Sequence, residues 1–353
     1  MSRFPQRPTL THVANEAAVS TVTVSRVLQG SDKVAPATKK RVHEAMERIG
    51  YFGNAAATNL VSGRTTSIGV IASHADDYGY SSTLKGIEEA AREREKAVLI
   101  SVIDGSDEKE VRRGVGLVVS NAVSGIIVMD FEAAGHSILP IVPNYLPVVS
   151  ATGLDGKENP GRSFVSMDLH EGGKQLGTHL IKQGHQTIFI LAPPYERLIQ
   201  RRSLGILDVL TEARLPHYPL IQCRDWQPHA GYDGTMQLLD EYGDQVTAIA
   251  CGNDEIALGA IRAVLDRGLR VPEDISVTGF DDHPLAAYSV PPLTTVRQDF
   301  VELGRLAFNL LDALIEDNSL PETRAVTPEL ILRSSVASPN PNRGLGALTS
   351  SSR

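Results

Sequence analysis

From residue 65 onward, short apolar segments alternate with amphipathic ones, and this alternation restricts the fold more than any other feature of the chain. The apolar segments are rich in Val, Ile and Ala, which is typical of strands buried on both faces of a parallel sheet. The segments between them place apolar residues at helical spacing. Strands connected through helices predict parallel sheets that are covered on both faces.

The expected elements form two series, the second beginning near residue 164. The strands are residues 66–73, 97–104, 124–130, 146–151, 163–169, 187–194, 219–225, 248–254 and 275–281. The helices between them are residues 82–97, 107–120, 171–184, 202–213, 231–243 and 255–268. Two series predict two α/β lobes. Because ligands bind beyond the carboxyl ends of the strands in open α/β sheets, two facing lobes predict a binding cleft.

Polar side chains lie at these strand ends in the second series. Asn253, Asp281 and Arg202 offer donors and acceptors suited to vicinal hydroxyl groups. Asp254 and Asp282 lie beside them, and for both we favour the plainer role of capping a helix.

Two aromatic residues are candidates for apolar contact with a ligand. A lone tryptophan is more often a packing residue, but Trp226 follows an expected strand at the cleft edge, where its ring can stack on the C–H face of a sugar. Phe300 is the candidate for the opposite apolar wall.

The first sixty-four residues contain three short helix patterns, at residues 9–17, 21–29 and 36–49. Thr9 is the expected cap of the first helix, Ser20 or Thr21 caps the second, and glycines end the second and third. From the second helix we expect Val24, Val27 and Leu28 to face inward. Two short helices joined by a tight turn, with a third to cover them, predict a helix-turn-helix unit.

The second helix leaves Thr21, Val22, Ser25, Arg26 and Gln29 facing outward. In a recognition helix such residues contact base edges in the major groove, and Arg26 can pair with guanine through two hydrogen bonds. The alternative is a small bundle whose polar face is merely solvated.

Charge favours the DNA-binding interpretation. Residues 1–64 contain nine Lys or Arg and four Asp or Glu, whereas the whole chain of 353 residues has a formal charge of −8. A basic module on an acidic body is typical of a nucleic-acid-binding head on a soluble sensor, although uneven surface charge alone gives the same pattern.

Other functional classes lack their usual signals. There is no apolar run long enough to span a membrane and no secretory signal, so we expect a cytoplasmic protein without membrane contact. Cys223 and Cys251 have no metal-ligand spacing and are expected to be free thiols. No P-loop, G-x-S-x-G or HExxH pattern occurs, so we expect no enzymatic activity, cofactor or metal.

Several segments resemble the LacI/GalR (lac repressor) family of transcription regulators. They are TLTHVANEAAVSTVTVSRVL, KVAPAT and IGYFGNAAATNLVSG near the start, then RRSLGI, DWQPHAGY, GNDEIALGAIRA, VTGFDDH and PPLTTVRQDF. The resemblance extends to about residue 339. It implies an α plus α/β fold class, with a three-helix headpiece and hinge followed by two doubly wound lobes like those of periplasmic binding proteins.

The resemblance also implies domain bounds. They are a headpiece at 1–52, a hinge at 53–64, a two-lobed core at 65–339 and a tail at 340–353. The N-lobe comprises about 65–163 and 296–325, including a helix at 301–317, and the C-lobe about 164–295 and 326–339. Crossovers are expected near 163–166, 294–298 and 323–328. The tail is rich in Gly, Ser and Pro and has no heptad repeat, so we expect it to be disordered and the protein to be a homodimer.

In this family the hinge folds on the operator, and a leucine inserts into the minor groove. Leu60 matches that leucine, and Ala57 matches the small residue where two hinge helices approach. The implied DNA contacts are Thr9, Leu10, Thr11, Ser20, Thr21, Val22, Ser25, Arg26, Gln29, Lys33, Asn54, Ala57 and Leu60. Two positions depart from the family pattern: Ala18 replaces a glycine in the turn, and Gly53 replaces a proline before the hinge. Both changes would weaken operator binding, through strain or through added flexibility.

The implied effector contacts are Arg202, Trp226, Asn253, Asp281 and Phe300. On the N-lobe, Ser73, Asp77 and Tyr80 occupy the loop after the first strand, where the chain differs from the family pattern. Thr152 or Asp155 stands where the family has an aspartate.

These features predict a repressor that a small sugar, such as a β-galactoside or β-glucoside, releases from a palindromic operator. One alternative is a regulator with a purine corepressor. A second is an exported sugar receptor with the same two-lobed core, against which the basic headpiece and the missing signal argue.

Overall fold

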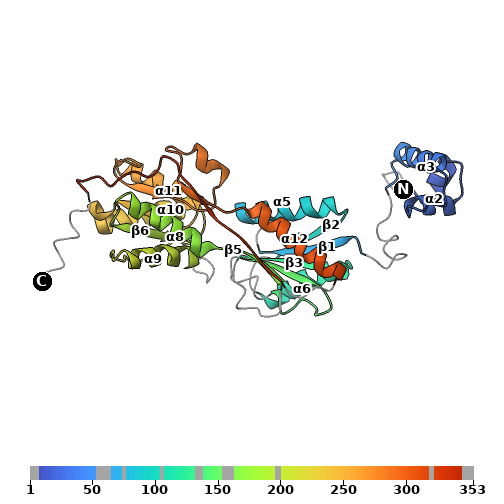
Figure 1. The fold of residues 1–353 in the computed structure, drawn as a ribbon, viewed down its shortest axis with the longest axis horizontal. Coiled ribbons are helices and arrows are strands. Elements are labelled where there is room, and N and C mark those ends of the chain that lie inside the picture. The colour runs from blue at the N-terminus through green and yellow to red at the C-terminus, as the bar shows by residue number, and fades with distance from the viewer. Residues whose placement is uncertain are drawn as a thin grey trace. The chain divides into compact units, whose positions relative to one another are not determined.

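The chain forms two compact units, residues 1–66 and 67–353 (Figure 1). The structure is a computed structural model, and it describes residues 8–52, 65–73, 77–103, 107–131, 138–152, 163–194, 200–317 and 322–343.

In its described residues, the first unit is a bundle of three helices: α1 (Leu10–Glu16), α2 (Thr21–Leu28) and α3 (Pro36–Ile49). Their apolar faces form a small core that includes Val13, Val24 and Val42. The three predicted helices are confirmed. The inward orientation expected for Leu28 is wrong, since this side chain is 38% exposed. Leu28 is the last residue of α2, and Val24 and Val27 already close the core.

The first lobe of the second unit, the N-lobe, is built on a six-stranded sheet. Its strands are β1 (Ser67–Ala72), β2 (Ala97–Val102), β3 (Ile126–Asp130), β4 (Val148–Thr152), β5 (Ser163–Met167) and β11 (Thr323–Val326). They are all parallel, in the order β11-β5-β4-β3-β1-β2. Helices α5 (Tyr78–Glu93) and α12 (Phe300–Asp317) pack together against this sheet, and α6 (Glu108–Ser120) packs on β1 and β2 (Figure 1).

Close packing of α5 on α12 depends on a glycine. A Cβ atom at Gly86 would lie 2.0 Å from the carbonyl oxygen of Val301, so any larger residue would push the two helices apart. This pair matters for the cleft because the first residue of each helix, Tyr78 and Phe300, lines it.

The second lobe, the C-lobe, has a parallel sheet in the order β7-β6-β8-β9. Its strands are β6 (Ile188–Ala192), β7 (Ile221–Gln222), β8 (Ala248–Cys251) and β9 (Ser276–Thr278). Its helices are α8 (Leu169–Lys182), α9 (Gln200–Glu212), α10 (Pro228–Tyr242) and α11 (Asp254–Asp266), with 3-10 turns η1 (Gly243–Gln245) and η2 (Pro284–Tyr288). Helices α8 and α9 pack as one pair and α10 and α11 as another. Two parallel-sheet lobes confirm the predicted fold class.

The lobes are joined by three passes of the chain. The first follows β5, and the other two run through β10 (Thr295–Arg297) and β12 (Glu329–Ile331), which pair antiparallel as a separate two-stranded sheet.

The start expected for the second series is wrong, because β5 hydrogen-bonds between β4 and β11 and therefore belongs to the first sheet. Its five residues are all buried, and a strand buried on both faces gives no signal of which sheet it joins. Helix α5 also begins at Tyr78, four residues before the expected start.

The C-terminal segment is ordered further than expected. Arg343 donates a hydrogen bond to Gly243 O at 2.9 Å and pairs with Asp244 at 3.2 Å. Asn340 donates one to Asp274 at 3.0 Å. The expectation of disorder is therefore wrong for residues 340–343, since polar side chains there bind the C-lobe. Residues 344–353 lie outside the described ranges.

Candidate DNA-binding surface and effector cleft

Helix α2 presents the side chains that the sequence assigns to base contact. The Ser20 hydroxyl accepts a hydrogen bond from the Thr23 N–H at 3.2 Å and so caps this helix. Thr21, Val22, Arg26 and Gln29 are exposed, whereas Ser25 is half-buried. Val22 is 56% exposed, so its apolar side chain is accessible for contact with a partner.

The described cations of the headpiece differ in their partners, and Arg41 donates a hydrogen bond to Ala17 O at 3.0 Å. Lys39, Lys40 and Arg48 form ion pairs with Asp32, Glu44 and Glu16, respectively. Arg26 and Lys33, in contrast, form no ion pair and no side-chain hydrogen bond with any residue of the described headpiece, and both are exposed. Both are therefore available to bind phosphate or base edges.

The turn before α2 is strained. Ala18 has a φ of +50°, a left-handed conformation that favours glycine. The strain expected where Ala18 replaces the family's glycine is therefore present. Thr9 and Thr11 at α1 are exposed, Leu10 is half-buried, and the Thr9 N–H donates to His12 Nδ1 at 3.0 Å. Gly53, Asn54, Ala57 and Leu60 lie outside the described residues.

A cavity lies between the two lobes of the second unit. It holds about 700 Å³ free of protein atoms, part of it open to solvent. Seven of the eight residues expected to contact the effector line it: Asp77, Tyr80, Arg202, Trp226, Asn253, Asp281 and Phe300. The eighth, Ser73, is buried and its Oγ lies 2.5 Å from the Tyr80 hydroxyl.

Seven further lining residues were not anticipated: Tyr78, Gly79, Phe131, Met167, Leu169, Gln227 and Glu255. Tyr78 and Gly79 lie between two residues that were anticipated, and Glu255 and Gln227 each lie within two residues of one. Phe131 follows β3 and Met167 is the last residue of β5. Neither lies next to a residue that was predicted to line the cavity. The side chain of Thr152 and the whole of Asp155 are not among those described.

Arg202, near the start of α9, is 8% exposed and its guanidinium is committed to the protein. One Nη donates to the Gly252 carbonyl, and the other lies 3.2 Å from Asp281 Oδ1. The group lies over the Phe280 ring, 4.4 Å from its centre, and 5.7 Å from the centre of Trp226. Its Nε is buried and has no hydrogen-bond partner within the described structure.

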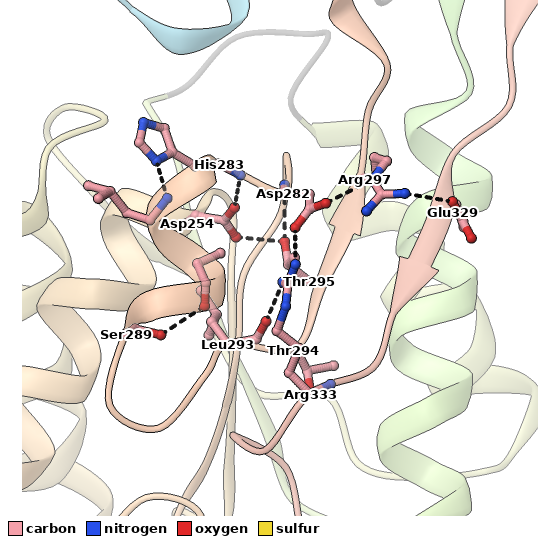
Figure 2. Close-up of polar contacts among 12 residues, drawn as sticks. Asp254, Asp282, His283, Ser289, Leu293, Thr294, Thr295, Arg297, Glu329 and Arg333 are labelled. Atoms are coloured by element: carbon pink, nitrogen blue, oxygen red, sulfur yellow. Dashed lines mark hydrogen bonds and ion pairs between the residues drawn. The ribbon is translucent and has the colours of Figure 1, made fainter.

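Asn253, rather than Asp254, caps helix α11. Its Oδ1 accepts from the Ile256 N–H at 2.8 Å, and its Nδ2 donates to Trp226 O at 3.1 Å and to Glu255 at 2.8 Å. The Asp254 carboxylate instead accepts hydrogen bonds from the Thr295 hydroxyl and the His283 N–H, both at 2.6 Å (Figure 2). The capping role predicted for Asp254 is therefore wrong. Burial, followed by the nearby charge of Asp281, raises the pKa of Asp254 well above its ordinary range.

Asp281 is held in an uncommon conformation. Its φ is +106°, and its N–H donates to Val296 O at 2.7 Å. Such strained residues concentrate at binding sites. Burial raises the pKa of Asp281 to about 7, although the Arg202 charge opposes the shift and the Glu255 charge adds to it. Gln298 also donates a hydrogen bond to this carboxylate.

Asp282 does not cap a helix either, since His283 takes that place before η2. Its carboxylate pairs with Arg297 at 2.8 Å and with Arg333 at 2.6 Å, and Arg297 in turn reaches Glu329 at 3.2 Å (Figure 2). Because Arg297 lies in β10 and Glu329 in β12, Asp282 ties the C-lobe edge of the cleft to the crossover strands.

The two sides of the cavity differ in chemistry. We call Arg202, Asn253 and Asp281 the polar wall, which belongs to the C-lobe. We call the N-lobe rings Tyr78, Tyr80, Phe131 and Phe300 the aromatic wall. These rings pack edge to face, with centres 4.9 Å apart for Tyr80 and Phe131 and 5.7 Å apart for Tyr78 and Phe300. Trp226 brings one further ring from the C-lobe side.

Within the described ranges, no group of His, Cys, Asp or Glu side chains could hold a metal ion. Across the same residues, no helix combines the length and apolar character needed to cross a membrane.

Two parts of the chain match known families. Residues 9–54 match the lacI family of bacterial regulatory proteins, and residues 178–336 match the periplasmic binding protein-like domain. Among curated proteins, catabolite control protein A of Priestia megaterium is 32% identical over 92% of this chain and 97% of its own length. The transcriptional repressor PurR of Glaesserella parasuis serovar 5 is 33% identical over 94% of this chain and 99% of its own.

Solved structures agree with this relationship. The lac repressor dimer bound to operator and the anti-inducer ONPF superimposes with a TM-score of 0.84 at 29% identity, covering 94% of this chain and all of that one. The transcriptional regulator CelR in complex with cellobiose superimposes with a TM-score of 0.70 at 28% identity, covering 93% of this chain and all of that one.

Proposed function

The chain belongs to the lacI family of DNA-binding transcriptional regulators, and we propose that it is a homodimeric repressor released from a palindromic operator by a small sugar. The sugar binds in the cavity between the lobes, and the candidates are a β-galactoside and a β-glucoside.

The observation that carries the sugar assignment is the pairing of a polar wall with aromatic rings across one cavity. Sugars present hydroxyl groups at their edges and C–H groups on their faces, so they need both kinds of contact. Asn253 and Asp281 offer the hydrogen-bonding groups, and Trp226 and Phe300 offer apolar surface.

For the DNA-binding half, exposed Arg26 and Val22 on α2 support base contact in the major groove. Lys33 supports a phosphate contact. For Leu60, Ala57 and Asn54 we propose the hinge role, with Leu60 inserted into the minor groove.

Sugar binding is coupled to DNA release through the passes between the lobes. A ligand that draws the lobes together shifts the N-lobe relative to its partner in the dimer and misplaces the hinge segments. A hundredfold loss of operator affinity requires about 2.7 kcal/mol of coupling, within the usual range for allostery.

The direct test has two steps with purified full-length protein. A thermal-shift screen over mono- and disaccharides and purines identifies a ligand, because saturation at one hundred times Kd adds about 2.7 kcal/mol of stability. Operator affinity is then measured by fluorescence anisotropy with and without that ligand.

We expect a sugar that stabilises the protein and weakens operator binding. The relatives include transcriptional repressors named PurR. A flat purine, the alternative ligand, could also lie between aromatic rings. A purine that strengthens operator binding would replace the sugar inducer with a corepressor. A stabilising sugar with no effect on operator affinity would refute the coupling.

A further inference from the structure

The charge balance of the cavity is uneven. Among the described lining residues, the carboxylates are those of Asp77, Glu255 and Asp281, and the one cation is Arg202. Arg202 pairs with Asp281 and with a backbone carbonyl, so its charge is already used within the protein. Among the described lining residues, carboxylates therefore outnumber cations.

Glu255 has no cationic partner within the described part of the chain. It lies at the N-terminus of α11, half-buried, and its carboxylate receives one hydrogen bond, from Asn253 Nδ2. The same nitrogen also donates to the Trp226 carbonyl oxygen. Asn253 thus links the Glu255 carboxylate to the main chain at Trp226, and all three residues line the cavity.

Electrostatic repulsion among the carboxylates adds to the effect of burial on their pKa values. The charge of Glu255 raises the pKa of both Asp281 and Asp254, in addition to the effect of burial. A neutral ligand would leave this repulsion in place, whereas a positive group beside Glu255 would relieve it.

Aromatic rings supply an independent reason to expect a cation. Trp226, Tyr78 and Phe300 line the same cavity as Glu255, and the centres of the Tyr78 and Phe300 rings lie 5.7 Å apart. A cation is attracted to the faces of such rings, and the attraction is strongest where water is excluded. Carboxylate and rings together form the kind of site that recognises an ammonium group.

We propose that the effector is an amino sugar, whose protonated amine is bound by Glu255 beside Trp226. This inference rests on the proposed function, because it specifies the sugar that enters the same cavity. Glu255 is then the residue that distinguishes a charged sugar from its neutral counterpart.

The test uses matched sugar pairs that differ in one group. Affinities of the full-length protein for glucosamine and glucose, for galactosamine and galactose, and for the glucosamine disaccharide and cellobiose are measured by calorimetry at neutral pH. N-acetylglucosamine is the control that keeps the nitrogen without its charge. We expect at least one amine to bind about tenfold or more tightly than its neutral partner, which corresponds to about 1.4 kcal/mol.

Glu255→Gln should remove this preference while keeping the hydrogen bond from Asn253. Affinity for the amine should fall about tenfold, and affinity for the neutral partner should stay within about threefold, which also shows that the site is folded. Glu273→Gln is the matched control, because it removes an exposed carboxylate of the same lobe outside the cavity lining. It should change neither affinity.

Equal or weaker binding of the amines in the wild-type protein would overturn the inference and leave the sugar assignment standing. Retention of the amine preference in Glu255→Gln would overturn the role of Glu255. If no sugar of either kind bound, the proposed function would fail and this inference with it. Should the variant fold poorly, added salt should weaken amine binding in the wild type more than neutral binding, and an equal response would refute the charge pairing.

Discussion

The two walls of the cleft are built by different physical means. On the polar wall, the protein itself holds each side chain. Asn253 caps a helix, Arg202 donates to a carbonyl, and the Asp281 carboxylate accepts from Gln298 and pairs with Arg202. On the aromatic wall, rings pack against rings, and few directional contacts set their positions. The polar wall therefore holds its donors and acceptors in place before a ligand binds. The aromatic wall, in contrast, is expected to adjust to the apolar faces of the ligand.

The two walls should therefore respond differently to mutation and to pH. The polar wall contains buried charges, so its energy depends on pH and on keeping pairs intact. The aromatic wall consists of four uncharged rings, so its energy depends on volume and contact area. Variants on the two walls should consequently differ in the pH dependence of their stability.

The largest expected effect is the loss of Arg202. Arg202→Leu leaves the buried Asp281 carboxylate without its cation and should lower the free energy of unfolding by about 3–5 kcal/mol at pH 8. At pH 5 the loss should be smaller, because Asp281, with a pKa of about 7, is then protonated. Urea denaturation at both pH values measures the difference.

Phe300→Ala is the comparison on the aromatic wall. Phe300 is 5% exposed, and its truncation should also cost about 3–5 kcal/mol, but equally at pH 5 and pH 8. Arg262→Leu, which removes an exposed pair with Asp266 on α11, should cost less than about 1 kcal/mol. A loss for Arg202→Leu that does not change with pH would break the proposed contrast between the walls.

The next effect is the pH dependence that Asp281 adds to stability. Its folded pKa of about 7 lies above the unfolded value near 3.9, so the folded state binds the extra proton between these values. Stability from this group is complete below pH 4 and is lost as the pH rises through 7, by at most about 4 kcal/mol. Asp281→Asn should flatten that part of the curve.

The measurement is the difference between the unfolding free energies of variant and wild type from pH 4 to pH 8. Asp233→Asn, which alters an exposed carboxylate of α10, should leave the slope unchanged. A difference curve that rises with acidification for Asp281→Asn would contradict the direction of the shift.

The residues of the polar wall could be predicted from the sequence more completely than those of the aromatic wall. Arg202, Asn253 and Asp281 were predictable because polar residues at the carboxyl ends of parallel strands converge on one edge. The sequence does not show whether Asn253 or Asp254 caps α11, since Asn and Asp are equally good caps. The choice depends on Thr295, distant in sequence, whose hydroxyl donates a hydrogen bond to Asp254.

Most of the aromatic wall was beyond sequence reasoning. Phe131 follows a strand of the first sheet, and nothing in its neighbours distinguishes it from a core phenylalanine. The sheet assignment of β5 was missed for a related reason, because its pairing with β11 joins residues far apart in the chain. The headpiece helices, in contrast, follow from caps and local periodicity.

A third prediction concerns ligand contact rather than stability. Trp226→Ala should weaken effector binding about 10- to 100-fold, since a central aromatic residue at a binding site typically contributes 2 kcal/mol or more. Operator affinity without effector should remain as in the wild type. Tyr145→Ala, at a ring that is 76% exposed, is the control and should change neither. Parallel loss of effector and operator binding would indicate misfolding instead.

The smallest effect should come from behind the aromatic wall. Ser73→Ala removes the buried hydroxyl that lies 2.5 Å from the Tyr80 hydroxyl, and it should lower the free energy of unfolding by about 1 kcal/mol. Because ring packing rather than this hydrogen bond positions Tyr80 against Phe131, effector affinity should fall less than about threefold, as calorimetry can measure. A tenfold loss of affinity would show that the aromatic wall, like the polar one, depends on a fixed hydrogen bond, and the contrast between the walls would no longer hold.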